Sequence, residues 1–324
     1  MKTHILMLIM VLSSVFATAQ MEETLVDLDR NVVIATSGLN MRNAPSLTAN
    51  IVGYVPFAAN LEIVDDLAYG KDTLSSAYTI HYETGEAYEA NLAGYWVKAK
   101  YKNLEGYVFS SYLFYDLSER EDSLNEAYIL LFEGTDCYDN VRYNKDWYWY
   151  GLYEEGNRSV LRAVELSFFA EETELGVFLG IATNLDQASV YLIGSENPLP
   201  QRVLKNATHV DYSQQFFDRE NVANLELLEA AGLAIVQPKG ENEWGFSLIV
   251  KDETGARQLL NPEDSDFYYP SGIDWYGDLD GDGKMDYIIH YGEEMSQTVL
   301  YLSSKAKPGA LVHPVAAYFS GYCC

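Results

Sequence analysis

Four aspartates lie close together in the stretch WYGDLDGDGKMDYIIHYG near the C-terminus. They occupy alternate positions and then a position four residues on: Asp278, Asp280, Asp282 and Asp286. Carboxylates this close repel one another unless a divalent cation neutralises them. Counted from Asp278, the backbone carbonyl of Lys284 falls at position seven and Gly283 at the sharp turn, which is the ligand order of a calcium loop. Hard oxygen ligands favour Ca²⁺ over a soft transition metal.

An EF-hand does not account for this loop, because position twelve is Ile289 and the residues after Asp286 read as a strand. The stretch DLDGDGKMDYII instead resembles the calcium-loop-and-strand element of FG-GAP and VCBS repeat proteins. Those families repeat the unit around a propeller, whereas here it occurs once, so the resemblance implies the loop and not the propeller. The remaining ligand could be water, Glu293 or an upstream acid such as Asp274. We expect the ion to fasten the folded loop, because it binds only the folded chain.

No catalytic arrangement stands out elsewhere. Cys137 is followed by Tyr138, Asp139 and Asn140 instead of the small-residue helix entry typical of cysteine peptidases. No paired-histidine zinc motif and no G-x-S-x-G elbow is present. The isolated histidines in the second half are His209, His290 and His313. A carboxylate pair for sugar cleavage stays open, because 48 acidic residues always allow some pair.

The three cysteines allow two kinds of disulfide in an oxidising compartment. Cys137 could pair with either Cys323 or Cys324, which would tie the end of the second domain to its beginning. The rival pairing joins Cys323 to Cys324. The spacing alone does not choose between them.

The first part of the chain contains the strands of a small barrel. Short apolar runs are separated by Gly, Asn and Pro, which predicts a compact β-barrel. The runs are Val32 to Ala35, Ile51 to Val55, Leu61 to Val64, Tyr95 to Ala99 and Gly106 to Phe109. The segments GLNMRNAPS, IVGYV, YWVKAKY and GYVFSSYL resemble the bacterial SH3 (SH3b) family.

Two departures from the family pattern stand out. The glycine usual before LEIV is replaced within residues 57–60, and residues 67–94 form a long insertion where the family usually has a short turn. Alternating Tyr78, Ile80 and Tyr82 predict an extra hairpin in the insertion.

The SH3b resemblance implies a binding or targeting module, because the family generally binds cell-wall peptides, other peptidoglycan parts or protein ligands. An aromatic groove could include Tyr54, Tyr69, Tyr95 and Tyr112, of which we take Tyr54, Tyr95 and Tyr112 as candidate ligand-binding residues. The alternative is that such aromatics fill the core or lie on plain surface. For Arg42 we favour a structural role, holding the loop after its strand by hydrogen bonds.

The second part of the chain also reads as mostly β. After a polar linker at residues 116–125, short and often alternating apolar runs are divided by Gly, Pro, Asn or acidic turns. One segment, Ser213 to Ala231, has apolar residues at near-helical steps and ends at Gly232, which predicts one or two short helices. The fold class is therefore mainly β: an SH3-like barrel at residues 30–115 and a mostly β domain at residues 126–324.

The predicted compartment and the net charge limit the classes of partner that the protein can bind. Residues 1–19 read as a signal peptide, with an apolar run too short to span a membrane and no cysteine for a lipid anchor, so we expect a secreted or periplasmic protein without a transmembrane segment. A formal net charge of −27 argues against nucleic acid and anionic membrane surfaces as partners. Cations and cationic partners fit.

The sequence predicts a secreted or periplasmic binding protein and not an enzyme. Its SH3b module would recognise a cell-envelope or protein ligand beside a calcium-stabilised domain of unassigned role. The alternative is a cell-wall or glycan hydrolase with its site in the C-terminal domain. A third reading is a structural or inhibitory partner of another secreted protein.

Overall fold

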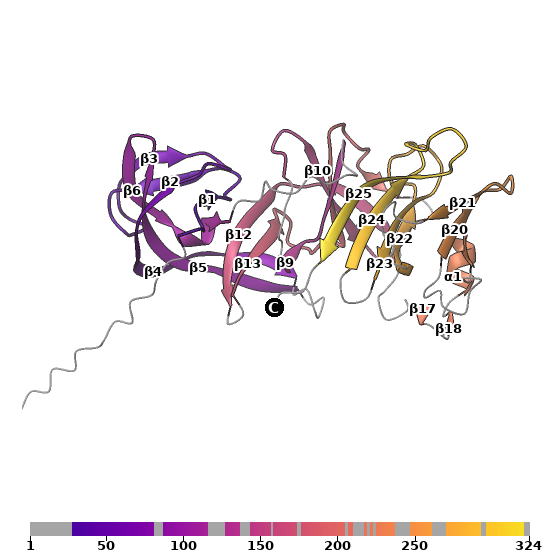
Figure 1. Ribbon diagram of the computed structural model, residues 1–324, viewed down its shortest axis with the longest axis horizontal. Coiled ribbons are helices and arrows are strands. Elements are labelled where there is room, and N and C mark those ends of the chain that lie inside the picture. Colours follow the sequence, from indigo (N-terminus) through magenta and orange to yellow (C-terminus); the bar gives the residue numbers. More distant parts are fainter. Residues whose placement is uncertain are drawn as a thin grey trace, which may run out of the picture.

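The structure is a computed structural model that describes most of the chain. The described residues are 28–80, 87–115, 127–136, 143–156, 158–173, 176–204, 207–209, 217–218, 221–222, 225–236, 247–260, 270–292 and 296–320. The described fold is mainly β, which confirms the predicted class. Figure 1 shows an elongated molecule with a barrel at one end and the helix α1 near the other.

The barrel is built from five strands in the order β3-β2-β6-β5-β4, with the pair β1-β7 beside them. Apolar residues alternate along these short strands, so Leu39 and Met41 of one strand and Val97 and Ala99 of another point into one buried core. The elements are β1 (Val32–Val33), β2 (Leu39–Arg42), β3 (Ile51–Val55), β4 (Glu62–Ile80), β5 (Ala87–Tyr101), β6 (Leu104–Phe109), the 3₁₀ turn η1 (Ser110–Tyr112) and β7 (Leu113–Phe114).

Residues 67–80 and 87–94 extend two of these strands into a long antiparallel pair. The strands β4 and β5 pair antiparallel as far as Ile80 and Ala87, and the ladder is interrupted by three register shifts. Leu92 near the start of β5 packs with Phe169 and Ala182 of the second part of the chain. The hairpin therefore rests on the strands β12 and β13 instead of projecting freely (Figure 1).

The middle of the chain forms two sheets. One has the order β15-β11-β10-β14-β8 and the other the order β12-β13-β9. The strands are β8 (Tyr128–Leu131), β9 (Gly134–Asp136), β10 (Tyr148–Glu154), β11 (Ser159–Ala163), β12 (Leu166–Thr173), β13 (Gly176–Thr183), β14 (Tyr191–Ser195) and β15 (Arg202–Val203).

The last part of the chain forms a central sheet with the order β16-β22-β23-β24-β25 and a smaller sheet with the order β19-β20-β21. The elements are β16 (Thr208–His209), β17 (Phe217–Asp218), β18 (Asn221–Val222), α1 (Leu225–Ala230), β19 (Leu233–Val236), β20 (Ser247–Lys251), β21 (Arg257–Leu260), β22 (Pro270–Gly277), β23 (Asp286–Tyr291), β24 (Ser296–Leu302) and β25 (His313–Ser320). Of the segment predicted to be helical, only α1 is helix among the described residues. Earlier in that segment β17 and β18 pair as a short ladder.

The central sheet separates two hydrophobic cores, because successive side chains of a strand face opposite ways. In β23, Ile288 faces the core made by the middle sheets, while Tyr287 and Ile289 face the core beneath α1 and the smaller sheet. The first of these cores also contains Ile34 and Phe114 of the barrel. The barrel and the second domain therefore share buried apolar surface.

Candidate functional site

The aspartate loop is the connection between β22 and β23, residues 278–285. Two glycines let it turn tightly: Gly281 has φ +91° and Gly283 has φ +86°, a region that side chains other than glycine rarely adopt. A Cβ at position 283 would meet nothing within 4 Å. Position 283 therefore favours glycine because of its backbone conformation and not because space is short. At position 281 a Cβ would also lie 2.9 Å from the guanidinium of Arg202.

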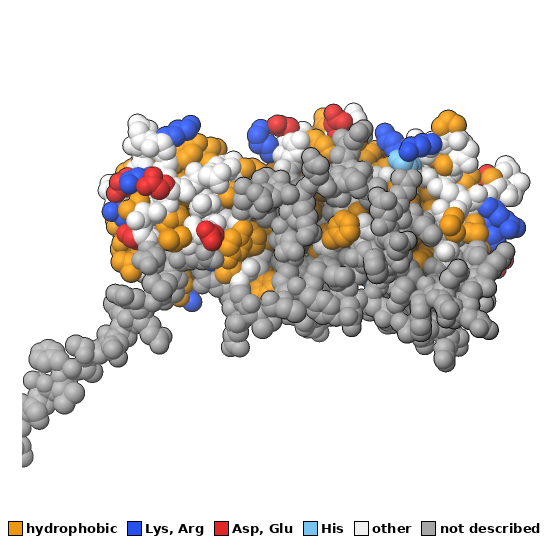
Figure 2. Space-filling view, viewed as in Figure 1, with side chains coloured by type: hydrophobic (Ala, Val, Ile, Leu, Met, Phe, Trp, Pro, Cys, Tyr) orange, Lys and Arg blue, Asp and Glu red, His pale blue; other side chains and the backbone are white. Residues whose placement is uncertain are grey.

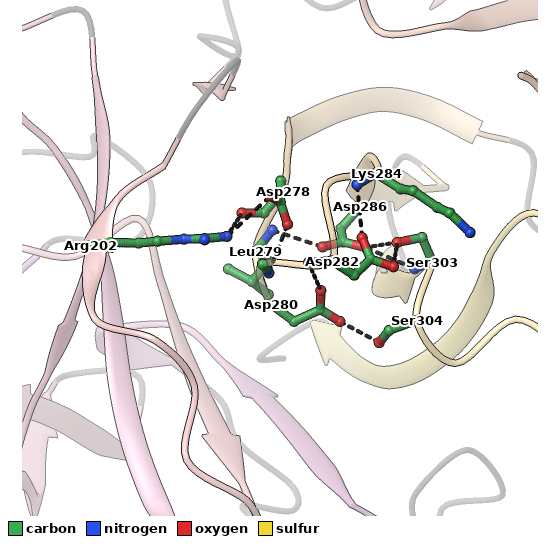
Figure 3. A network of polar contacts seen from close by, with 10 residues as sticks. Arg202, Asp278, Leu279, Asp280, Asp282, Lys284, Asp286, Ser303 and Ser304 are labelled. Atoms are coloured by element: carbon green, nitrogen blue, oxygen red, sulfur yellow. Dashed lines mark hydrogen bonds and ion pairs between the residues drawn. The ribbon is translucent and has the colours of Figure 1, made fainter. Parts of the chain in front are cut away.

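The turn gathers three of the predicted ligands. Asp278, Asp280 and Asp286 each offer a carboxylate oxygen, and these oxygens lie within 4.8 Å of one another. Figure 3 shows the three side chains converging from the start of the loop and from the first residue of β23. The spacing in the sequence thus does bring the carboxylates together in space.

Asp286 is the buried member of the group, with none of its surface exposed. Its Oδ2 accepts a hydrogen bond from the backbone N–H of Leu279 (2.7 Å), and its Oδ1 accepts from the N–H and the hydroxyl of Ser303 (2.8 and 3.0 Å). Burial raises the pKa of Asp286 to about 7, the negative charge of Asp280 contributes in the same direction, and the bonds from Ser303 act against both. Any cation at this position would favour the ionised form.

Asp282 and Asp280 contact the loop that follows β24. The Oδ2 atom of Asp282 accepts from the Ser303 hydroxyl (3.0 Å), and its Oδ1 accepts from the N–H of Lys284 (2.8 Å). Ser304 donates its hydroxyl to the Oδ2 atom of Asp280. The three carboxylates that lie within 4.8 Å of one another do not include that of Asp282, which lies beside them through Ser303.

Arg202 reaches the loop from β15 in another sheet. One of its guanidinium nitrogens lies 3.0 Å from the backbone carbonyl oxygen of Asp278 and 3.2 Å from the carboxylate Oδ2 of the same residue (Figure 3). The positive charge offsets part of the repulsion within the acidic turn. It also links the loop to the middle sheets.

Sequence reasoning missed Ser303, Ser304 and Arg202. The serines come directly after a buried apolar strand, but nothing local links them to a loop 17 or more residues away. Arg202 lies 76 residues from Asp278. These contacts follow from strand pairing, which the spacing of the aspartates does not encode.

The donor set fits a hard divalent cation. The oxygens gathered at the turn belong to carboxylates and to the hydroxyls of Ser303 and Ser304, and oxygen is the ligand atom that Ca²⁺ prefers. Of the other ligands considered, Asp274 is outside the three-carboxylate group. Glu293 lies outside the described residues.

Asp274 instead belongs to a polar cluster between the central sheet and the middle sheets. The hydroxyl of Tyr191 donates to Oδ2 of Asp274, which sits at a register shift in β22. His290 Nδ1 lies 3.9 Å from the same oxygen and 3.0 Å from the hydroxyl oxygen of Thr298. A hydrolytic triad needs the two ring nitrogens of the histidine to serve different partners. Here one nitrogen faces both, so the cluster is not arranged as a triad.

The three candidate ligand-binding tyrosines of the barrel differ in their surroundings. Tyr54 on β3 is 54% exposed, and its hydroxyl donates to the backbone oxygen of Ser37 (2.6 Å). Tyr95 is partly buried, with the Lys71 ammonium 5.6 Å from its ring centroid. Tyr112 is partly buried against both the barrel core and the Leu92 cluster, and burial raises its pKa. Tyr54 is the one with most of its surface free.

Two further residues can be placed. Arg42 donates to the backbone oxygen of Ala49 (2.6 Å), which confirms that it holds the loop after its strand. Cys137, Cys323 and Cys324 lie outside the described residues.

Comparison with known proteins bears on the barrel. Residues 37–114 match the bacterial SH3 domain family, which confirms the SH3b resemblance for this part of the chain. No curated protein and no solved structure matches the chain. Among the described residues, no helix has the length and apolar character needed to cross a membrane.

Proposed function

We propose that this is a secreted or periplasmic binding protein whose bacterial SH3 module recognises a cell-envelope or protein ligand. The match of residues 37–114 to the bacterial SH3 domain is the observation that carries the proposal. Cell-wall material is the ligand class that such a domain suggests. The second domain would support the module, and no specific role is assigned to it.

The exposed ring of Tyr54 is the best available contact for a ligand. A tyrosine offers a large apolar face and a polar tip, which suits recognition of sugars and peptides. Tyr112 is already used in packing against two hydrophobic clusters, so we assign it to stability. Tyr95 would contribute at the edge of such a site.

Co-sedimentation with purified peptidoglycan sacculi tests this function. We expect the protein to sediment with sacculi and Tyr54→Ala to weaken the binding, while Tyr148→Ala keeps it. Tyr148 is a matched control, because it is about equally exposed but lies on β10 outside the module. A protein that stays in the supernatant in both the presence and the absence of Ca²⁺ would contradict recognition of the wall.

We propose further that the β22–β23 turn holds one Ca²⁺ ion. Asp278, Asp280 and Asp286 would bind it with carboxylate oxygens, Lys284 with its backbone carbonyl and Asp282 with a carboxylate at the border of the group. The ion would neutralise charges that otherwise repel, and so stabilise the folded turn. The convergence of three carboxylates, one of them fully buried, supports this role.

Calorimetric titration with Ca²⁺ tests the ion directly. We expect one site per chain, and loss of that site in Asp280→Asn. Asp146→Asn removes an exposed carboxylate far along the chain and should leave the titration unchanged. Equal heats in the protein and in Asp280→Asn would contradict the site.

A further inference from the structure

The strand β3 is a free edge of the barrel sheet. Among the described residues it pairs with β2 on one side and with no strand on the other. A free edge presents main-chain N–H and C=O groups that a further strand can satisfy. Figure 1 shows β3 at the rim of the barrel.

This edge carries no charged side chain, although charge is one of the usual protections of an edge strand against pairing. Natural edge strands are blunted by charged side chains, especially lysine, or by covering segments. No residue from 43 to 61 is charged, although 21% of the chain is charged and its net charge is −27. Elsewhere on the barrel, charged side chains of both signs surround the apolar ones on the face seen in Figure 2. The uncharged edge is therefore a local exception.

The side chains of β3 offer an apolar surface. Val52 is 41% exposed, and the ring of Tyr54 follows it on the same face of the strand. Ile51, at the start of the strand beside a register shift in the β2–β3 ladder, is also 55% exposed. The opposite face turns inward, since Val55 is fully buried and Gly53 lies against Leu104. A strand added beside β3 could continue this pattern, with apolar side chains at alternate positions.

The length of β3 and the net charge of the chain argue against a second copy of the chain as the partner that binds this edge. Stable dimers usually bury at least about 1,200 Å² in total, and β3 has only five residues. Two chains of charge −27 also repel each other over several ångströms. A short extended peptide does not need an interface of that size and does not carry such a charge. A basic peptide is attracted by the acidic protein, and a neutral one is not repelled.

We infer that β3 binds an extended segment of a partner protein, which adds to the sheet as a sixth strand. The segment would be neutral or basic and would carry apolar side chains at alternate positions. This inference rests on the proposed role of the module in ligand binding. Within that role it commits to a protein segment, because apolar side chains at alternate positions match the exposed side chains of Val52 and Tyr54.

A displayed library of unstructured peptides, selected on the full-length protein, tests the inference. The edge variant is Val52→Lys, which places a charge on an exposed position of β3. The control is Leu259→Lys, because Leu259 is 50% exposed and lies on β21, at the edge of a different sheet. Ile51→Lys serves as a second edge variant in case Val52→Lys does not fold. Hydrogen exchange of the β3 amides is measured with the best peptide bound.

We expect selected peptides to bind the protein and Leu259→Lys alike, and to lose at least about tenfold in affinity for the edge variants. Exchange of amides in residues 51–55 should slow on binding. Peptides that bind the edge variants undiminished, or a library without binders, would overturn the inference. Binding to sacculi is measured in parallel on the same variants. If no peptide binds at β3 but sacculi are still bound, only this inference is removed. If peptides bind at β3 but sacculi are not bound, only recognition of the wall is removed.

Discussion

Asp286 and Glu133 are buried carboxylates held by hydrogen bonds. Asp286 accepts from two backbone N–H groups and one hydroxyl. Glu133 accepts from the N–H and hydroxyl of Thr183 (3.2 and 3.1 Å) and from those of Ser189 (2.7 and 2.6 Å). Glu133 thereby ties three segments of the middle sheets together, whereas Asp286 lies at a turn with other acids.

The pH dependence of stability should report on Glu133. Burial raises its pKa above the ordinary value of 4.5, although the hydrogen bonds from Ser189 and Thr183 act against this. A raised folded-state pKa gives stability that is complete below pH 4.5 and is lost as pH rises through the folded-state value. Glu133→Gln does not titrate, so it lacks this loss.

We therefore expect the free energy of unfolding of the protein, minus that of Glu133→Gln, to decrease as pH rises from 4 toward neutrality. Denaturant titration across this range measures the difference, and other acids contribute equally to both proteins. Glu253→Gln, which makes the same change at an exposed glutamate, is the control. A difference that rises with pH, or that does not change, would contradict the assigned direction.

The convergence of the aspartates could be predicted from the sequence, and the residues that hydrogen-bond to them could not. Asp278, Asp280 and Asp286 lie within nine residues of chain, so a single turn brings them together whatever surrounds it. Ser303 and Arg202 approach only because β24 pairs with β23 and because β15 lies across from the loop. Single-sequence spacing carries no information on such long-range contacts.

The β4–β5 hairpin is the element that joins the barrel to the second domain. Leu92 packs against Phe169 of β12 and Ala182 of β13, and the Trp96 indole donates to Asp72 across the hairpin (2.7 Å). Thr36 of the barrel adds a hydrogen bond to the backbone oxygen of Leu166 (3.0 Å). The insertion in the family pattern therefore contributes to the contact between the barrel and the second domain.

Leu92→Ala should lower the stability of the whole protein by about 2 to 5 kcal/mol, because it removes a buried leucine and leaves a cavity between β5 and β12. Denaturant unfolding measures the loss. Leu47→Ala, at an exposed position of the barrel, should change the same free energy by less than about 0.5 kcal/mol. Equal losses for the two variants would mean that the hairpin contact stabilises nothing.

Alternation predicted this hairpin, and near-helical spacing predicted the short helix α1 near the end of residues 213–231. Alternating apolar residues are typical of a strand with one buried face and do not fit the period of a helix. The pattern at residues 78–82 therefore predicted a strand. In the later segment the apolar spacing fits a helix, yet Phe217 and Val222 pair across a short ladder and the described helix spans only Leu225–Ala230. The prediction of a short helix is therefore confirmed at Leu225–Ala230, while the described residues before it form a short strand pair.

At the scale of the whole molecule, the barrel and the second domain are joined by a common core. Ile34 and Phe114 of the barrel belong to the same buried cluster as Trp149 and Ile193 of the middle sheets. Domains that share buried apolar surface lose it together when either unfolds. The sequence predicted two modules and did not show that their cores meet.

We expect the barrel and the second domain to unfold in one calorimetric transition. Agreement between the calorimetric and van't Hoff enthalpies would support this behaviour. Two separated transitions, with Leu92→Ala shifting only one of them, would show that the two parts are energetically independent.

The central claim is that a ligand-binding barrel is carried by a domain whose acidic turn is fastened by a hard divalent ion. Thermal melting in Ca²⁺ and in chelator tests it most directly. At about a hundredfold excess of Ca²⁺ over its Kd, the stabilisation should be about 2.7 kcal/mol. The account predicts a higher midpoint in Ca²⁺ for the protein and little or no shift for Asp280→Asn. Identical midpoints in the two conditions, with no metal bound to the protein, would contradict it.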